Sequence, residues 1–241
     1  MEFGLRVVLV APRNPLNIGA AARAMSNFGF SELCLVKPYD IAFQEARSAV
    51  RSRHILEGAT LVSSVAEAVA GCTLVIGTTS VGHRELHIPL YRLEAAGDVM
   101  RQALSSGVAV ALLFGSEKFG LSNDDMSHCN WLLRIPTRAE HGSMNLGQAV
   151  AVCLYELRRT AAVAANDIAS AERILAEDLE RLTAMLGEIL TLSGYVNQRT
   201  AHSTELKLRR LVRRLGVPAS DIDTWLGIMR QILWKLQQML C

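Results

Sequence analysis

The chain has 241 residues, of which 50% are hydrophobic and 20% are charged, so it can bury a core and lacks the composition of a disordered chain. Its net charge of +2 does not by itself point to an anionic partner. The sequence has no apolar run of the roughly 18 residues that a membrane span needs, no signal-peptide pattern and no Cys-x-x-Cys pair among its five cysteines, and we therefore expect a cytoplasmic protein without disulfides.

Up to about Thr160, short apolar runs alternate with helical segments, which predicts an α/β fold with a mostly parallel sheet. The expected strands read as continuous hydrophobic runs, as strands covered on both faces do: Leu5–Ala11, Leu33–Val36, Thr73–Gly77, Val108–Phe114 and Trp131–Ile135. The expected helices are Asn17–Asn27, Phe43–Leu56, Val65–Ala70, Leu93–Ser105 and Asn145–Ala164. Ser122, followed three residues later by Asp125, predicts the start of one more short helix.

From Ala165 onward the strand pattern stops, and helical periodicity predicts helices at Ser170–Ser193, Ser203–Leu215 and Asp221–Leu240. We therefore expect two domains, residues 1–164 and 165–241. Residues 196–241 carry eight basic and three acidic side chains. Five of the eight basic ones lie in one expected helix, which presents them either to an anionic partner or only to solvent: Lys207, Arg209, Arg210, Arg213 and Arg214.

In open α/β sheets, ligands bind at the carboxyl ends of the strands, and the segments that follow the expected strands are polar or small. After the first strand, Asn17 is placed to cap the next helix, whose free N–H groups would attract an anion. Arg23 lies less than two turns into that helix and could clamp a phosphate with paired donors. The alternative is a surface arginine on an alanine-rich helix.

Three further loops are consistent with a ligand at the same edge of the sheet. Residues 78–82 supply hydroxyl groups and a glycine, and residues 136–143 lead into a long helix. Gly115 and Gly120 have the spacing of a phosphate-binding loop, but Leu121 stands where that loop needs its lysine, which excludes a nucleotide triphosphatase loop. Together, the four loops predict one binding crevice.

Other kinds of site lack support in the sequence. His83 and His87 are four residues apart, but the residues between them do not follow the zinc protease order, and we expect no metal. A hydrolase Gly-x-Ser-x-Gly and a dinucleotide-binding Gly-x-Gly-x-x-Gly are both absent. We expect Trp131, Trp225 and Trp234 in the core or in an interface rather than stacked on bases.

Three stretches of the sequence occur in the order found in one family of enzymes. They are Asn14-Pro15-Leu16-Asn17-Ile18-Gly19 with Arg23, Leu113-Phe114-Gly115-Ser116-Glu117 with Gly120-Leu121, and Ile135-Pro136 followed by Ser143-Met144-Asn145-Leu146. Across about residues 5–160 the chain resembles the SpoU branch of the SPOUT RNA methyltransferases. Its tail, with Gly194-Tyr195 before Leu208-Arg209-Arg210-Leu211, resembles the members that methylate the ribose of nucleotide 32 in the tRNA anticodon loop.

This resemblance implies a sheet that ends in a trefoil knot, S-adenosylmethionine held in that knot, and a homodimer with active sites at its interface. By similarity, the cofactor pocket would be lined by Thr78, Thr79, Ser80, Gly115, Ile135, Gly142, Ser143 and Met144. By similarity, the active centre would consist of Arg23, Asn17, Glu117, Ser143 and Asn145.

Transfer of a methyl group to a ribose 2′-hydroxyl needs an in-line approach and a group that holds the neighbouring phosphate. We expect Arg23 to bind that phosphate and orient the 2′-oxygen, helped by Asn17 or Ser143, because guanidinium groups keep their proton and are poor bases. The 2′-hydroxyl restricts the substrate to RNA, so DNA should be inert. The basic residues of the tail become the expected tRNA contact, although residues 197–204 match no fixed family pattern.

Three alternatives stay open. The chain could methylate another site in tRNA or ribosomal RNA, because related branches carry nearly the same motifs. It could be a catalytically silent RNA-binding protein on the same fold, which the intact Arg23, Glu117 and Asn145 disfavour. It could also be an α/β enzyme for a small nucleotide-like substrate, and tRNA binding that falls steeply with salt would count against that.

Overall fold

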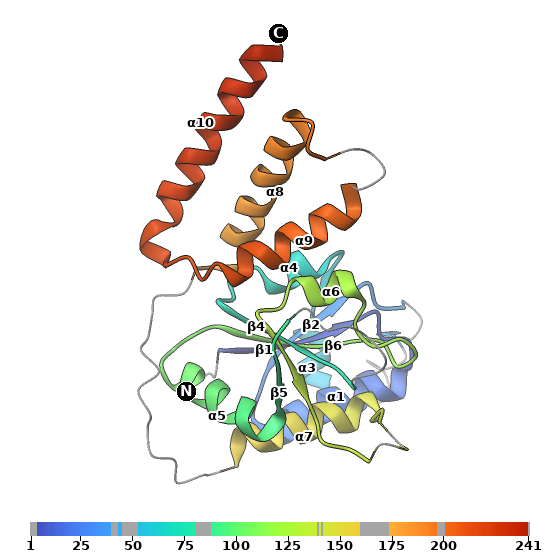
Figure 1. Ribbon diagram of the computed structural model, residues 1–241. Coiled ribbons are helices and arrows are strands. Elements are labelled where there is room, and N and C mark those ends of the chain that lie inside the picture. The colour runs from blue at the N-terminus through green and yellow to red at the C-terminus, as the bar shows by residue number, and fades with distance from the viewer. Residues whose placement is uncertain are drawn as a thin grey trace. The chain divides into compact units, whose positions relative to one another are not determined.

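The computed structural model describes residues 4–39, 43–44, 53–80, 88–138, 140, 142–159, 174–196 and 201–240 (Figure 1). The chain divides into two compact units, residues 1–166 and 167–241. Parts of three expected helices, at Phe43–Leu56, Asn145–Ala164 and Ser170–Ser193, lie outside the described residues, as do His83 and His87.

The first unit is built on a seven-stranded sheet of order β3-β2-β1-β6-β4-β7-β5, in which every pair of neighbouring strands is parallel. The mostly parallel α/β fold expected from the sequence is therefore confirmed. The strands are β1 (Leu5–Val10), β2 (Glu32–Val36), β3 (Thr60–Val62), β4 (Leu74–Thr78), β5 (Leu90–Arg92), β6 (Val110–Phe114) and β7 (Trp131–Arg134).

Two strands, β3 and β5, were not expected from the sequence, and both lie at an edge of the sheet. Each is only three residues long, and all of their residues are exposed or half-buried. Because an edge strand pairs on one side only, it needs no continuous apolar run. The hydrophobic pattern therefore identified the five inner strands and not these two.

The helices of this unit are α1 (Pro15–Phe28), α3 (Arg53–Glu57), α4 (Val65–Val69), α5 (Leu93–Ser105), α6 (Asn123–Ser127) and α7 (Leu146–Arg158). The capping box expected at α6 is confirmed, with the Ser122 and Asp125 side chains each bonded to the backbone of the other. The expected cap of α1 was wrong. Asn14, not Asn17, is the N-cap, because Pro15 fits the first position of a helix and its missing N–H costs nothing there.

Helices α1, α5 and α7 lie along one face of the sheet (Figure 1). Val7 of β1 belongs to the same core cluster as Ile18 of α1 and Val150 of α7. The two helices pack so closely that a Cβ on Gly147 would lie 2.5 Å from the Cβ of Ala20. Small side chains thus hold the first turn of α7 against α1, which brings the loops before the two helices together.

The second unit contains α8 (Ala176–Leu192), α9 (Ala201–Arg214) and α10 (Ile222–Leu240), with a single 3-10 turn at Ala219–Asp221 before α10. The helices bury a small apolar core of their own, formed by Ile174, Leu179, Leu182, Val212, Ile222, Leu226 and Met229.

The three tryptophans occupy different environments. Trp131 is half-buried, and its ring lies edge-on to that of Tyr91, with 5.3 Å between the centroids. Trp225 and Trp234 of α10 are 36% and 51% exposed, so neither is a core residue of this chain. That Trp225 and Trp234 lie in an interface, the other alternative expected from the sequence, stays a prediction.

Candidate active site

A cavity of about 310 Å³ lies at the carboxyl ends of β4, β6 and β7, and this volume is at the lower end of the range for small-molecule pockets. Its walls come from the segments that follow these three strands. All eight residues that the sequence resemblance assigned to a cofactor pocket line it: Thr78, Thr79, Ser80, Gly115, Ile135, Gly142, Ser143 and Met144.

The loop after β6 closes tightly on itself, because Gly115 lets two stretches of backbone meet. A Cβ at Gly115 would lie 2.0 Å from the carbonyl carbon of Gly120 and 2.1 Å from the nitrogen of Leu121. Ser116 and Gly120 form an antiparallel bridge, with 2.8 Å between the Gly120 nitrogen and the Ser116 oxygen. No side chain fits at position 115, so the resemblance to a phosphate-binding loop reflects this closure.

Glu117, in the same loop, connects it to the start of α1. Its Oε1 accepts hydrogen bonds from the backbone nitrogen of Asn14 at 3.1 Å and from Nδ2 of Asn17 at 3.0 Å. Its Oε2 accepts from the backbone nitrogen of Arg13 at 3.2 Å. The carboxylate therefore fixes the loop after β1 against the loop after β6, although the two are about 100 residues apart in sequence.

A second hydrogen bond extends this network to α7. Nδ2 of Asn145 donates to Oδ1 of Asn17 at 2.8 Å, while Oδ1 of Asn145 caps α7 by accepting from the nitrogen of Gln148 at 3.2 Å. Because Asn17 then donates to Glu117, both amide groups have only one orientation that satisfies every bond. Glu117, Asn17 and Asn145 thus join the three sequence motifs at one place.

The charge of Glu117 is favoured by its surroundings. Partial burial alone would raise the pKa of this carboxyl group, but the hydrogen bonds from the Asn17 side chain and from the backbone of Glu117, Asn14 and Arg13 outweigh it and lower the pKa below its ordinary value. Glu117 is therefore an anion with a structural task and is poorly suited to accept a proton from a substrate.

The other predicted catalytic residues do not all line the cavity. Ser143 lines the cavity and is exposed. Asn17 is 8% exposed and lies behind the cavity wall, where it holds Glu117 and Asn145. Arg23 is exposed on α1 and is not among the residues that line the cavity of its own chain. The roles of all these residues in catalysis stay predictions.

Sequence reasoning missed several residues of this region. Lys118, Phe119 and Thr137 line the cavity, and Asn14 supplies both the cap of α1 and a donor to Glu117. The Asn-Pro pair was the signal that could have identified Asn14, because proline favours the first turn of a helix. Nothing in the sequence singles out Phe119.

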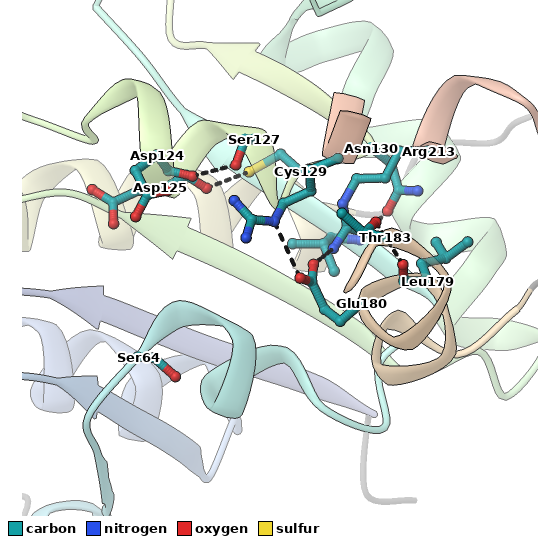
Figure 2. A network of polar contacts seen from close by, with 12 residues as sticks. Ser64, Asp124, Asp125, Ser127, Cys129, Asn130, Leu179, Glu180, Thr183 and Arg213 are labelled. Carbon is teal, nitrogen blue, oxygen red and sulfur yellow. Dashed lines mark hydrogen bonds and ion pairs between the residues drawn. The ribbon is translucent and has the colours of Figure 1, made fainter. Parts of the chain in front are cut away.

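Two of the five basic tail residues predicted to contact RNA have an acidic partner inside the helical unit. Nη2 of Arg213 lies 2.7 Å from one oxygen of Glu180 (Figure 2), and Nε of Arg209 lies 3.1 Å from the other. Arg209 also binds Glu205 at 2.7 Å. The other three basic residues follow a spacing of three and four along α9, and the side chains at both ends of the series are exposed: Lys207, Arg210 and Arg214.

Within the described part of the chain, no group of three or more His, Cys, Asp or Glu side chains could hold a metal ion. The described helices also include none with the length and apolar character needed to cross a bilayer.

Comparison with known proteins places these features in context. The model of the SpoU rRNA methylase family matches residues 4–155. A tRNA (cytidine/uridine-2′-O-)-methyltransferase, TrmJ of Yersinia enterocolitica, is 33% identical over 240 residues, which cover 96% of this chain and 92% of that protein. A tRNA (cytidine/uridine/adenosine-2′-O-)-methyltransferase, TrmJ of Pseudomonas aeruginosa, is 33% identical and covers 94% of this chain and 93% of its own length. The crystal structure of TrmJ from Z. mobilis ZM4 has a TM-score of 0.81 and 30% identity, covering 94% of this chain and 98% of that one.

Proposed function

This chain belongs to the SpoU rRNA methylase family, and we propose that it methylates the ribose 2′-hydroxyl of nucleotide 32, a cytidine or uridine, in the anticodon loop of tRNA. The methyl donor is S-adenosylmethionine. One observation carries the proposal: the similarity to tRNA ribose methyltransferases extends over both units, helical tail included. We further propose that the enzyme works in the cytoplasm and that its sheet ends in a trefoil knot.

The cavity has the chemistry that this cofactor needs. Leu133, Ile135 and Leu146 provide apolar walls for a flat purine ring, and Thr79 and Ser80 add residues with hydroxyl groups to the lining. The close approach of backbone at Gly115 leaves no side chain between the loop and a ligand. When bound, S-adenosylmethionine would supply a methyl group carried by a positively charged sulfur. The ribose 2′-oxygen can accept this methyl group.

The residues around the cavity have different roles in this proposal. We assign Arg23 to the phosphate next to the reacting ribose, where its paired donors orient the 2′-oxygen. Ser143, exposed in the cavity wall, helps to position the ribose 2′-hydroxyl group. The proton of this ribose hydroxyl leaves to the phosphate or to water. Asn17 is a positioning residue, because it is buried behind the wall and acts through Glu117 and Asn145.

Arg23 reaches an active site most simply in a homodimer. It lies on α1, outside the cavity of its own chain. Large apolar side chains are exposed on α1 and on its neighbour α7, namely Leu16 at 77% and Tyr155 at 55%. We propose that these helices meet a second copy of the chain and that Arg23 serves the cavity of the other subunit.

We propose that the basic residues of the tail bind tRNA. The ion pairs inside the helical unit decide which of these residues are suitable for a test. Substituting Arg209 or Arg213 would break their ion pairs with Glu180, so a loss of binding would not be informative. Lys207→Glu with Arg214→Glu avoids that network. We expect this double variant to weaken tRNA binding and lower its salt dependence while the affinity for S-adenosylmethionine is kept. Unchanged tRNA affinity would refute the proposal that the tail binds tRNA.

The decisive experiment measures methyl transfer from labelled S-adenosylmethionine to unmodified tRNA transcripts. Arg23→Ala and a transcript with 2′-deoxyribose at position 32 should each abolish transfer, whereas Arg53→Ala, an exposed arginine paired with Glu57, should not. Transfer that survives the deoxy substitution but not Arg23→Ala would move the target to another nucleotide. No transfer to any RNA would contradict the proposal and favour a silent RNA-binding protein.

A further inference from the structure

Phe119 lies at the cavity, yet its side chain is largely exposed. The residue is 62% exposed and belongs to the loop after β6 that forms one wall of the cavity. A single exposed aromatic residue is ordinary on a protein surface. This one lies beside the cavity proposed to take the methyl donor, where a substrate has to approach.

The loop holds Phe119 in a fixed place. Both ends of the loop meet at Gly115 and Gly120, and the Phe119 nitrogen lies 3.4 Å from Oγ of Ser116. In the middle of the loop, Glu117 is bonded to the loop before α1. Because the backbone of such a constrained turn is already ordered, little backbone entropy is lost when a ligand covers the side chain, which favours binding.

Lys118 completes the surface. Its Nζ lies 5.1 Å from the centroid of the Phe119 ring, within the range of a cation–π contact. An aromatic ring beside an ammonium group matches a nucleotide, whose base stacks on the ring while a phosphate meets the charge. A protein partner is a poorer match, because the buried centres of protein interfaces are depleted in lysine.

We propose that Phe119 and Lys118 form a nucleotide platform on which one base of the substrate RNA stacks beside the reaction site. The inference rests on the proposed function, because an RNA ribose must approach the cavity to receive the methyl group. The strand that delivers it then runs past this loop. The platform is indifferent to base identity, since every base has a face to stack.

The test compares Phe119→Ala, Phe119→Leu and Phe119→Trp in the full-length protein, with Kd measured for tRNA and for S-adenosylmethionine. Base stacking on an aromatic side chain predicts a rise in the tRNA Kd of roughly 5- to 150-fold for alanine. Tryptophan should keep the Kd within about threefold, because its ring also stacks. Leucine should behave more like alanine, since it is apolar but has no aromatic face.

Two further measurements identify the contact. A 2-aminopurine placed in turn at each nucleotide flanking the target should be quenched by the wild-type protein at one position, and Phe119→Ala should abolish that quenching. Lys118→Ala should lower the slope of log Kd against log salt by about one. Quenching that persists in the alanine variant would overturn the platform.

Failure of the platform is distinguishable from failure of the proposed function. If the wild type transfers methyl groups to tRNA and Phe119→Ala binds tRNA equally well, the platform is wrong and the function stands. If Phe119→Leu is as good as wild type and alanine changes the oligomeric state, Phe119 packs against another subunit instead. An equal loss of affinity for tRNA and for S-adenosylmethionine would assign the ring to the cofactor.

Discussion

Glu117→Gln changes a single atom at the centre of the candidate site. In the wild type, one carboxylate oxygen accepts from Asn17 and Asn14, and the other accepts from the backbone nitrogen of Arg13. A glutamine can keep its carbonyl oxygen toward the first two donors. Its amide nitrogen then faces the N–H of Arg13, donor against donor, so one hydrogen bond is lost and two lose the assistance of the negative charge.

The expected cost follows from these three bonds. Hydrogen bonds to a charged acceptor stabilise by about 1.5–3 kcal/mol and neutral ones by about 1 kcal/mol, but solvent screens a partly exposed carboxylate and reduces the difference. We expect Glu117→Gln to lower the free energy of unfolding by about 1–2 kcal/mol and Glu117→Ala by somewhat more. At about 2–4 °C per kcal/mol for a chain of this size, the melting temperature should fall by roughly 2–8 °C.

The assay needs a signal from the sheet unit alone. Trp131 lies in β7, whereas the other two tryptophans, Trp225 and Trp234, lie in α10. Urea unfolding followed by Trp131 fluorescence, in a Trp225→Phe and Trp234→Phe background, reports the unit that contains the site. Equal urea midpoints and equal S-adenosylmethionine affinity for wild type and Glu117→Gln would refute the idea that the carboxylate fixes the loop after β1 against the loop after β6.

The same pair of proteins gives a pH prediction for Glu117. Because the pKa of its carboxyl group is lower in the folded protein than in the unfolded chain, folding favours the anion, and the stabilisation is fully present at neutral pH. It should disappear as the pH falls below about 4, through the lowered folded pKa. The difference in stability between wild type and Glu117→Gln should shrink over that range, and a difference that grew on acidification would contradict the hydrogen-bond account.

Three further predictions concern other parts of the chain. Gly115→Ala should destabilise the sheet unit by about 1–3 kcal/mol, because its Cβ would meet backbone at 2.0 Å, whereas Gly142→Ala, whose nearest neighbour would be 3.8 Å away, should leave the urea midpoint almost unchanged. An equal mixture of Arg23→Ala and Gly115→Ala chains should regain about a quarter of wild-type transfer. Half of the dimers are then mixed, and each mixed dimer has one intact site, which combines the cavity of one chain with Arg23 of the other. No recovery would mean that Arg23 acts within its own subunit. Glu180→Gln, which removes a carboxylate shared by two arginines, should lower the melting temperature of the helical unit clearly more than Glu205→Gln, whose 55% exposed carboxylate forms a surface ion pair of about 0.5 kcal/mol.

Much of the fold could be predicted from the sequence because the inner strands of a parallel sheet are buried on both faces. The runs that became β1, β2, β4, β6 and β7 carry that burial as a continuous apolar pattern. The two edge strands carry no such pattern. Helix caps were predictable where the capping residue and its reciprocal acid lie three residues apart, as at Ser122 and Asp125.

Physical reasoning predicted a crevice at the carboxyl ends of the strands, but only the resemblance singled out the individual residues that line it. Glu117 pairs with Asn17 across 100 residues, and Asn145 with Asn17 across 128, so no local spacing announces either bond. The same limit applies to the tail. The basic side chains of α9 were visible in the sequence, but their acidic partner Glu180 lies 29 and 33 residues earlier, on another helix.

The hydrogen-bonded path from Glu117 through Asn17 to Asn145 has a consequence for how the protein is made. Of these three residues, Asn17 comes first in the chain, at the start of α1, and Asn145 comes last, as the cap of α7. During synthesis, the carboxyl ends of the early strands leave the ribosome long before Asn145 does, and contacts between distant segments form slowly. The pocket proposed for the methyl donor is therefore incomplete in a nascent chain until α7 has docked, and we expect cofactor binding to appear only at the end of folding in the sheet unit.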